Sequence, residues 1–189
     1  MMASKIAPAL AAGNTIVIKP AESVCLSIME FFREMADILP PGVVNVVTGY
    51  GADVGEPLVT HPDVRKVAFT GSVPTAQKIM QYASRNIIPQ TLELGGKSPF
   101  IVFDDADLDA AVEGAIQSKY RNAGQTCVCA NRLLVQAGVY DAFAEKLAEA
   151  VKDLRVGNGL TEEVEQGPLI DMAAVEKVEE HIADAVSKG

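Results

Sequence analysis

The sequence predicts an α/β fold built on a doubly wound parallel sheet. Short runs of β-branched and other apolar residues alternate with segments of helical spacing along most of the chain. Strands that alternate with helices form parallel βαβ units with right-handed crossovers. The alternation pauses at Gly95-Gly96 and then restarts, so we expect a soft domain boundary there, between residues 1–95 and 96–189.

In the first half of the chain, glycine and proline residues mark the ends of the predicted elements. A helix over 5–12 stops at Gly13, and Pro40-Pro41-Gly42 stops a helix over 26–39 whose apolar residues share one side. The other predicted elements are strands over 15–18, 43–47, 66–69 and 89–94 and helices over 54–60 and 75–84.

The second half repeats this rhythm with longer helices. The predicted elements are strands over 99–103 and 132–136 and helices over 108–120, 140–154 and 175–187. With 49% hydrophobic residues among 189, the chain is long enough for one generous domain or for parts of two.

Composition excludes some classes of protein. The formal net charge of -9 argues against nucleic acid as a partner, because such binding depends on Lys and Arg at phosphates. The three cysteines are too few and too irregular for a secreted disulfide framework. The apolar segment 6–12 is too short for a signal peptide, and no run approaches the length of a membrane span. We therefore expect a soluble, cytoplasmic protein that does not bind a membrane.

The segment from Arg121 to Asn131 is the strongest candidate for catalytic chemistry. A thiol that follows a glycine turn near basic side chains has the setting of a reactive thiolate, and Gly124 allows such a turn. Both Cys127 and Cys129 fit this description. A buried, inert cysteine is equally compatible with the segment.

Two glycine loops could each hold a phosphate group, because each follows a predicted strand and precedes a predicted helix. The first is the segment 49–55, whose glycine spacing is one residue longer than the commonest dinucleotide fingerprint. The second is Thr70-Gly71-Ser72. Spacing does not choose between these loops.

Two carboxylates at strand ends have both a functional and a structural interpretation. Glu22, with Lys19 beside it, could bind ribose hydroxyls or could stabilise the start of the next helix. Glu93 lies between leucines, where apolar surroundings would raise its pKa toward the range of a general base, or it faces water.

No metal site is visible in the sequence. The aspartates at 104, 105, 107 and 109 precede a helix without the closing Glu of a calcium loop, so capping explains them better. His61 and His181 have no partners at ligand spacing and are interpreted as surface residues.

Four motifs in register resemble those of the aldehyde dehydrogenase superfamily, over essentially the whole chain. They are Ile18-Lys-Pro-Ala-Glu22, Val67-Ala-Phe-Thr-Gly-Ser72, Leu92-Glu-Leu-Gly-Gly-Lys-Ser-Pro99 and Asn122-Ala-Gly-Gln-Thr-Cys127. The resemblance implies part of a Rossmann-like NAD-binding domain over 1–95 and part of a catalytic domain over 96–189. Because family chains are longer, it also implies that this chain is an internal fragment that has no activity alone. The full-length protein is expected to be a homodimer or homotetramer.

The resemblance assigns a role to each candidate residue and selects the second glycine loop. The catalytic pair is Cys127 as nucleophile and Glu93 as general base. The cofactor contacts are Lys19, Glu22, Gly71, Ser72 and Leu94. The implied cofactor is NAD, with NADP as the alternative, because the charge of a glutamate at position 22 repels a 2′-phosphate.

The implied reaction is covalent. The thiolate of Cys127 adds to a small aldehyde, hydride passes to the nicotinamide, and water activated by Glu93 hydrolyses the thioester to an acid. At residues 3–5 this chain has Ala3-Ser4-Lys5. Family members that have Thr-Arg-Lys at these positions use the arginine to bind the substrate. The second glycine of the family's Gly-Ser-x-x-x-Gly turn is Ala76 here.

A narrower resemblance to succinate-semialdehyde dehydrogenases rests on Phe103-Asp-Asp-Ala-Asp-Leu-Asp109, Tyr120-Arg-Asn122 and Cys127-Val-Cys-Ala-Asn-Arg132. It implies that Arg121 binds the carboxylate of succinic semialdehyde, which suits the planar donors of arginine. Two alternatives remain: an enzyme of the same fold with another aldehyde substrate, and a non-catalytic chain that binds a nucleotide.

Cys129 has two interpretations of its own. If the segment is extended, residues two apart face the same side, and Cys129 could form a reversible disulfide with Cys127 that silences the enzyme. The alternative is a small packed neighbour. A thiol peroxidase built on these two cysteines would leave the Lys19–Glu22 and Gly71–Ser72 motifs unexplained.

Overall fold

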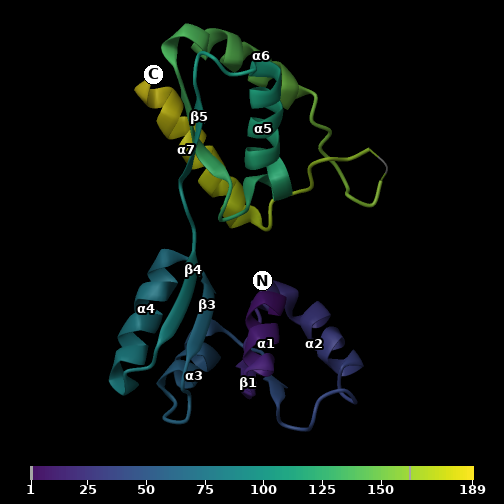
Figure 1. The fold of residues 1–189 in the computed structure, drawn as a ribbon, viewed down its shortest axis with the longest axis vertical. Helices are drawn as coiled ribbons and strands as arrows, with labels where there is room; N and C mark the ends of the chain where they lie inside the picture. The colour runs from purple at the N-terminus through teal and green to yellow at the C-terminus, as the bar shows by residue number, and fades with distance from the viewer. Residues whose placement is uncertain (1, 162) are drawn as a thin grey trace. The chain divides into compact units, whose positions relative to one another are not determined.

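The computed structural model describes residues 2–161 and 163–189 (Figure 1). Its contacts divide the chain into two compact units, residues 1–94 and 95–189. Each unit has its own hydrophobic core.

The first unit contains four short strands that pair in parallel. Strand β1 (Ile16–Ile18) pairs with β2 (Val44–Val46), and β3 (Val67–Gly71) pairs with β4 (Gln90–Leu94). The parallel pairing confirms the predicted α/β class, because each pair is joined by a crossover that contains a helix. Within the described residues the strands form two separate two-stranded ladders.

One helix precedes these strands, and further helices and short helical turns connect them. They are α1 (Met2–Ala11), η1 (Glu22–Val24), α2 (Cys25–Glu34), η2 (Gly51–Gly55), α3 (Glu56–Thr60), α4 (Val73–Ala83) and η3 (Ser84–Asn86). The helix expected over 26–39 ends at Glu34, because three-residue turns from Phe32 to Met35 and from Met35 to Ile38 replace the α-helical hydrogen bonds. The segment 51–55 forms a π-helical turn before α3. The α-helix expected over 54–60 therefore begins at Glu56.

The core of the first unit lies where α3 and α4 cover the β3–β4 pair. Its buried members are Val59, Ile79, Ala83 and Ile88, and Phe69 of β3 packs against them. Ala76, which stands where the family pattern has a second glycine, is also buried on α4 at 1% exposure. Its methyl group is therefore accommodated at this position.

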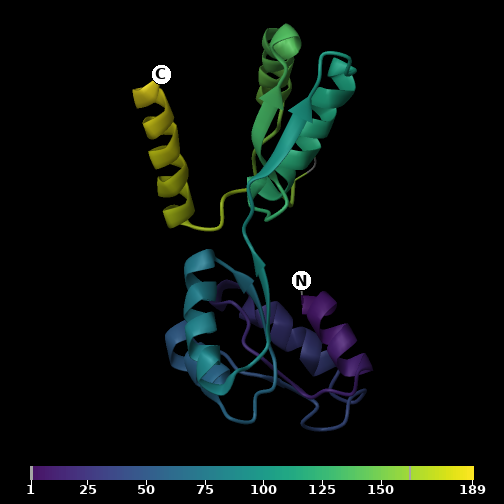
Figure 2. The same cartoon turned by 60° about the vertical axis from the view of Figure 1, so that its left-hand side comes forward.

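The second unit pairs β5 (Ser98–Val102) in parallel with β6 (Ala130–Val135). Its helical elements are α5 (Leu108–Tyr120), η4 (Arg121–Gly124), η5 (Ala137–Val139), α6 (Tyr140–Lys152) and α7 (Met172–Lys188). Figure 2 shows α5 and α6 alongside the strand pair, and their core includes Val112 and Phe143. The carboxylate of Asp107 caps α5 by accepting hydrogen bonds from the N–H groups of Asp109 and Ala110, which confirms the capping interpretation of this residue.

Candidate active site and cofactor corner

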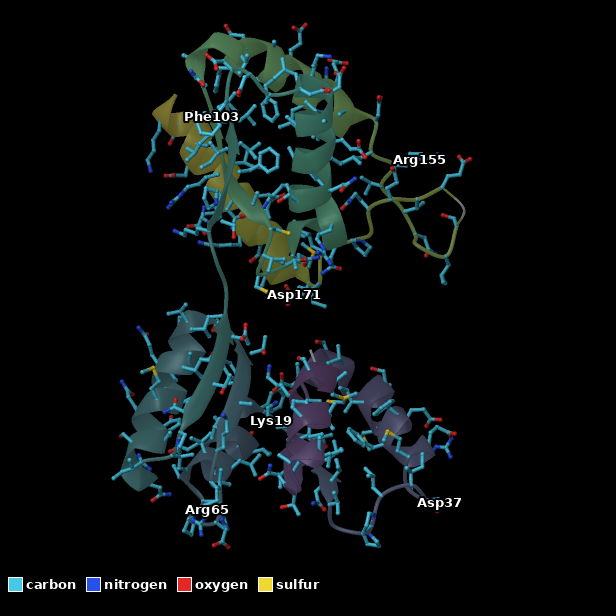
Figure 3. The ribbon with its side chains drawn as sticks, viewed as in Figure 1. Lys19, Asp37, Arg65, Phe103, Arg155 and Asp171 are labelled. Atoms are coloured by element: carbon cyan, nitrogen blue, oxygen red, sulfur yellow. The ribbon has the colours of Figure 1, made fainter. Side chains whose placement is uncertain are left out.

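One lysine joins the ends of the first strand pair. Because β1 and β2 are parallel, their carboxyl ends meet, and the Val47 N–H donates to the Ile18 carbonyl at 2.9 Å. The Nζ of Lys19 (Figure 3) then donates to the carbonyl of Gly49 at 3.0 Å and to Glu22 Oε1 at 3.1 Å. The first glycine loop is thus attached to the predicted ribose-binding pair, which we name the Lys19–Glu22 corner.

The carboxylate of this corner carries a stable negative charge. A hydrogen bond from its own backbone N–H and then the neighbouring ammonium of Lys19 lower the pKa of Glu22 below its usual value. Glu22 also begins η1, so the structural interpretation of a helix-starting carboxylate holds. Its side chain remains 48% exposed and accessible to a ligand.

The second glycine loop lies at the carboxyl end of β3 and at the N-terminus of α4. Ser72 caps this helix, with its Oγ 3.4 Å from the N–H of Thr75. A Cβ at Gly71 would lie 2.5 Å from the Cζ of Phe69, so any side chain at this position would force the ring or the loop to move. Lys5 of α1 donates to Thr70 Oγ1 at 2.6 Å. Sequence reasoning missed this contact, because the two residues are far apart in the sequence.

Glu93 and Leu94 lie at the same strand end as this loop. In the parallel ladder Glu93 faces Thr70 and Leu94 faces Gly71. Glu93 is exposed, and within the described part of the chain its carboxylate makes no hydrogen bond or ion pair. The apolar surroundings expected for a general base are therefore not formed by the residues of this unit.

The two cysteines of the second unit have opposite environments. Cys127 is exposed, whereas Cys129 is buried at 1% exposure, and both are free thiols. The segment is not extended at the two cysteines: residues 127 and 128 form a turn, which the N–H of Cys129 closes by donating to the Thr126 carbonyl at 3.1 Å. Strand β6 begins only at Ala130, so the geometry favours the packed-neighbour interpretation of Cys129.

The approach to Cys127 is a tightly coiled backbone segment. Asn122 and Ala123 both have φ of 53°, and Gly124 follows with φ of 75°. Left-handed non-glycine residues carry strain that the surrounding structure must hold in place. The predicted glycine turn is therefore present, within a sharper chain reversal than expected.

Side-chain amides hold this segment, and sequence reasoning did not identify them as supports. Gln125 accepts a hydrogen bond from the Ile170 N–H at 3.0 Å, and its own NH₂ donates to the Asn122 carbonyl at 3.2 Å. Gln166 donates to the Tyr120 carbonyl at 2.6 Å. Only Gln125 had a local signal, as part of the motif that precedes Cys127.

Arg121 lies on the surface, at the start of η4. It borders a shallow hollow together with Ile116, Tyr120, Leu154 and Gln166. Its carbonyl lies 4.0 Å from the Sγ of Cys129, which places the buried thiol beneath the Arg121 backbone.

The described residues contain no group of metal-ligating side chains. None of their helices is long and apolar enough to span a membrane.

Comparison with known proteins identifies close relatives over the whole chain. The model of the Aldehyde dehydrogenase family matches residues 1–189. The glutarate-semialdehyde dehydrogenase of Pseudomonas aeruginosa is 58% identical over 191 residues, which cover 100% of this chain and 39% of that protein. The NADP(+)-dependent succinate-semialdehyde dehydrogenase of Escherichia coli is 57% identical over 191 residues, with the same coverage of 100% and 39%.

A solved structure agrees with these relatives. The crystal structure of succinate-semialdehyde dehydrogenase from Burkholderia pseudomallei superposes with a TM-score of 0.95 at 56% identity, covering 100% of this chain and 39% of that one. The chain thus spans about two-fifths of the length of the relatives that it matches, at 39%.

Proposed function

The chain belongs to the aldehyde dehydrogenase family, and from this premise we propose that it is part of an enzyme that oxidises an aldehyde to its carboxylic acid. The observation that carries the proposal is the exposed thiol of Cys127 on a braced turn, next to a second cysteine that is buried. In the second unit, a thiol so placed is the available nucleophile.

In the proposed reaction, the Sγ of Cys127 forms a bond to the aldehyde carbon and the carbonyl oxygen becomes an oxyanion. When bound, NAD supplies the acceptor for the hydride that leaves this carbon, and a thioester to Cys127 remains. Glu93 takes a proton from the water that attacks the thioester, so the acid departs and the thiolate is restored. In this proposal the nucleophile Cys127 belongs to the second unit, and the general base Glu93 belongs to the end of the first unit.

The first unit has features that fit a dinucleotide. The Lys19–Glu22 corner offers a carboxylate for ribose hydroxyls, and the N-terminus of α4, which begins directly after Gly71 and Ser72, is the proposed position of a pyrophosphate. Leu94 lies opposite Gly71 in the ladder and is proposed to contact the cofactor. Because a fixed negative charge at Glu22 repels a 2′-phosphate, we propose NAD over NADP, although the Escherichia coli relative uses NADP(+).

The proposed substrate is an aldehyde with a carboxylate at its other end, such as succinic semialdehyde. Support comes from the names of the relatives and from the surface guanidinium of Arg121, which can bind a carboxylate with two parallel hydrogen bonds. The alternative is a family member that prefers uncharged aldehydes. We further propose that the protein is cytoplasmic and that it forms a homodimer or homotetramer. Light scattering of the purified protein would test the oligomeric state.

The test uses the natural gene product and follows NADH absorbance with succinic semialdehyde and with butanal. We expect a higher kcat/KM for the semialdehyde, and loss of that preference in Arg121→Leu with butanal turnover retained. Cys127→Ala should produce no NADH from either aldehyde. Turnover that survives this substitution would exclude the covalent mechanism, and cofactor binding without any turnover would support a non-catalytic chain.

A further inference from the structure

Asn131, at the start of β6, links two parts of the second unit through the two ends of its amide. Its Oδ1 accepts a hydrogen bond from the Nζ of Lys119, at the end of α5, at 2.9 Å. Its Nδ2 donates to the carbonyl of Gly96, 35 residues earlier in the chain, at 2.9 Å. One side chain therefore ties the helix that precedes the cysteine turn to the segment that enters β5.

Gly96 is in turn packed against the backbone of the nucleophile. A Cβ built at Gly96 would lie 3.0 Å from the carbonyl oxygen of Cys127, a tighter contact than side chains ordinarily make. On the other side, the carbonyl of Lys119 would lie 3.3 Å from a Cβ at Gly124, and its Nζ 3.6 Å from it. Gly96 thus lies against the turn at residues 126–129, which we name the cysteine turn, and Lys119 lies against Gly124 in the segment that leads into this turn. Asn131 bonds to both Gly96 and Lys119.

We infer that Asn131 is a positioning residue for the nucleophile: it holds Gly96 against the carbonyl of Cys127 and Lys119 beside Gly124, and so fixes the backbone that carries the thiol. This inference rests on the proposed function and adds a residue to it. The strained conformations at Asn122 and Ala123 need such external support, because an isolated segment would relax from them. A displacement of about 1 Å at a reacting group can reduce a rate about a hundredfold.

A simpler role for Asn131 would be to satisfy the ammonium of Lys119 and to add general stability. The variant Asn131→Asp distinguishes the positioning role from this stabilising role. An aspartate keeps an oxygen that accepts from Lys119, but it has no donor for the Gly96 carbonyl. Asn131→Asp therefore removes only the bond to Gly96, the residue that packs against the carbonyl of Cys127, whereas Asn131→Ala removes both bonds and Lys119→Met removes only the bond to Oδ1.

Two residues provide matched controls. Asn86 also donates its Nδ2 to a distant carbonyl, that of Thr60 at 2.8 Å, in the first unit. Lys146 pairs with Asp109 on the surface of the second unit, away from the cysteine turn. The substitutions Asn86→Ala and Lys146→Met remove contacts of the same chemistry, and we expect melting temperatures within about 2–4 °C of wild type for each variant.

The first readout is steady-state kinetics of the natural gene product. We expect Asn131→Ala and Asn131→Asp each to lower kcat by about tenfold or more, with the KM for NAD unchanged and both controls near wild type. A wild-type kcat in Asn131→Asp, or an equal loss in Asn131→Ala and Asn86→Ala, would overturn the inference.

The second readout does not depend on turnover. Trypsin releases residues 122–132 as one peptide, in which fragment ions distinguish iodoacetamide on Cys127 from iodoacetamide on Cys129. We expect wild type to react at Cys127 alone, and Asn131→Ala and Asn131→Asp to react at both cysteines because the turn opens. An unchanged pattern in both variants would overturn the inference. If wild type instead oxidises no aldehyde, the proposed function fails, and this readout still decides the role of Asn131.

Discussion

The ammonium of Lys19 lies 3.1 Å from Glu22 Oε1 and 3.0 Å from the carbonyl of Gly49, so the end of β1 and the loop after β2 are joined by a single side chain. A carboxylate that is already oriented and ionised loses little conformational entropy when a ligand binds. The corner therefore presents a fixed negative charge to whatever approaches the ends of these strands.

Glu22→Gln should shift the cofactor preference toward NADP. The substitution removes the charge that repels a 2′-phosphate and keeps the shape of the side chain, so we expect the ratio of kcat/KM for NAD to that for NADP to fall about tenfold. The control is Glu30→Gln, because Glu30 also has a lowered pKa, caused by Arg33. An unchanged ratio in Glu22→Gln would show that other groups select the cofactor.

The same charge predicts how cofactor preference depends on pH. The backbone N–H of Glu22 and the ammonium of Lys19 lower the pKa of Glu22 below its usual value, so the carboxylate stays ionised across the neutral and mildly acidic range. Its interaction with Lys19 contributes stability above the unfolded pKa, which is lost only as pH falls through the lowered one. NADH and NADPH titrations by fluorescence should give a constant ratio of dissociation constants between about pH 5 and 8. A collapse of this ratio between about pH 7 and 6 would point to a histidine instead.

Cys129→Ala should leave the response to peroxide unchanged. Cys129 is buried and Cys127 exposed, with a turn between them, so a disulfide would require this turn to open. We expect dithiol to restore activity equally after mild peroxide treatment of wild type and Cys129→Ala. Recovery in wild type alone would instead support the reversible disulfide.

The sequence predicted elements that depend on local patterns and missed those that depend on distant contacts. The periodicity of residues 108–120 and the cap at Asp107 gave the bounds of α5, because both signals lie within the helix itself. The early end of α2 at Glu34 has no such signal, since apolar residues continue at helical spacing beyond it.

The site divides in the same way. The motif residues before Cys127 indicated a glycine turn, and the structure contains one. The bonds from Asn131 to Gly96 and from Gln166 to Tyr120 join residues 35 and 46 positions apart, and no periodicity encodes them. The sequence also left open whether Glu93 is buried or faces water, because apolar neighbours in the sequence do not bury a strand residue whose side chain faces the other side.

Gly71→Ala should weaken cofactor binding through Phe69. The new Cβ would lie 2.5 Å from the ring, which packs in the core of the first unit, so the ring or the loop must move. We expect a loss of about 1–3 kcal/mol in stability, measured by urea unfolding, and a higher dissociation constant for NADH. Gly71→Ala with Phe69→Leu should recover stability, because the smaller side chain leaves room. If the single variant matches Gly51→Ala, whose Cβ would contact nothing within 4 Å, crowding at Gly71 is unimportant.

Gly96→Ala should reduce catalysis more than it reduces stability. The added methyl group would press on the carbonyl of Cys127 at 3.0 Å, so the backbone of the nucleophile must yield by a few tenths of an ångström. We expect kcat to fall about tenfold or more while the melting temperature changes by only a few degrees. The matched control is Gly138→Ala in η5, where a Cβ meets nothing within 4 Å. Because the crowding acts on the same turn that Asn131 holds, Gly96→Ala and Asn131→Ala should be non-additive in kcat. Independent, multiplicative losses would mean that the methyl group and the amide act on the nucleophile by separate routes.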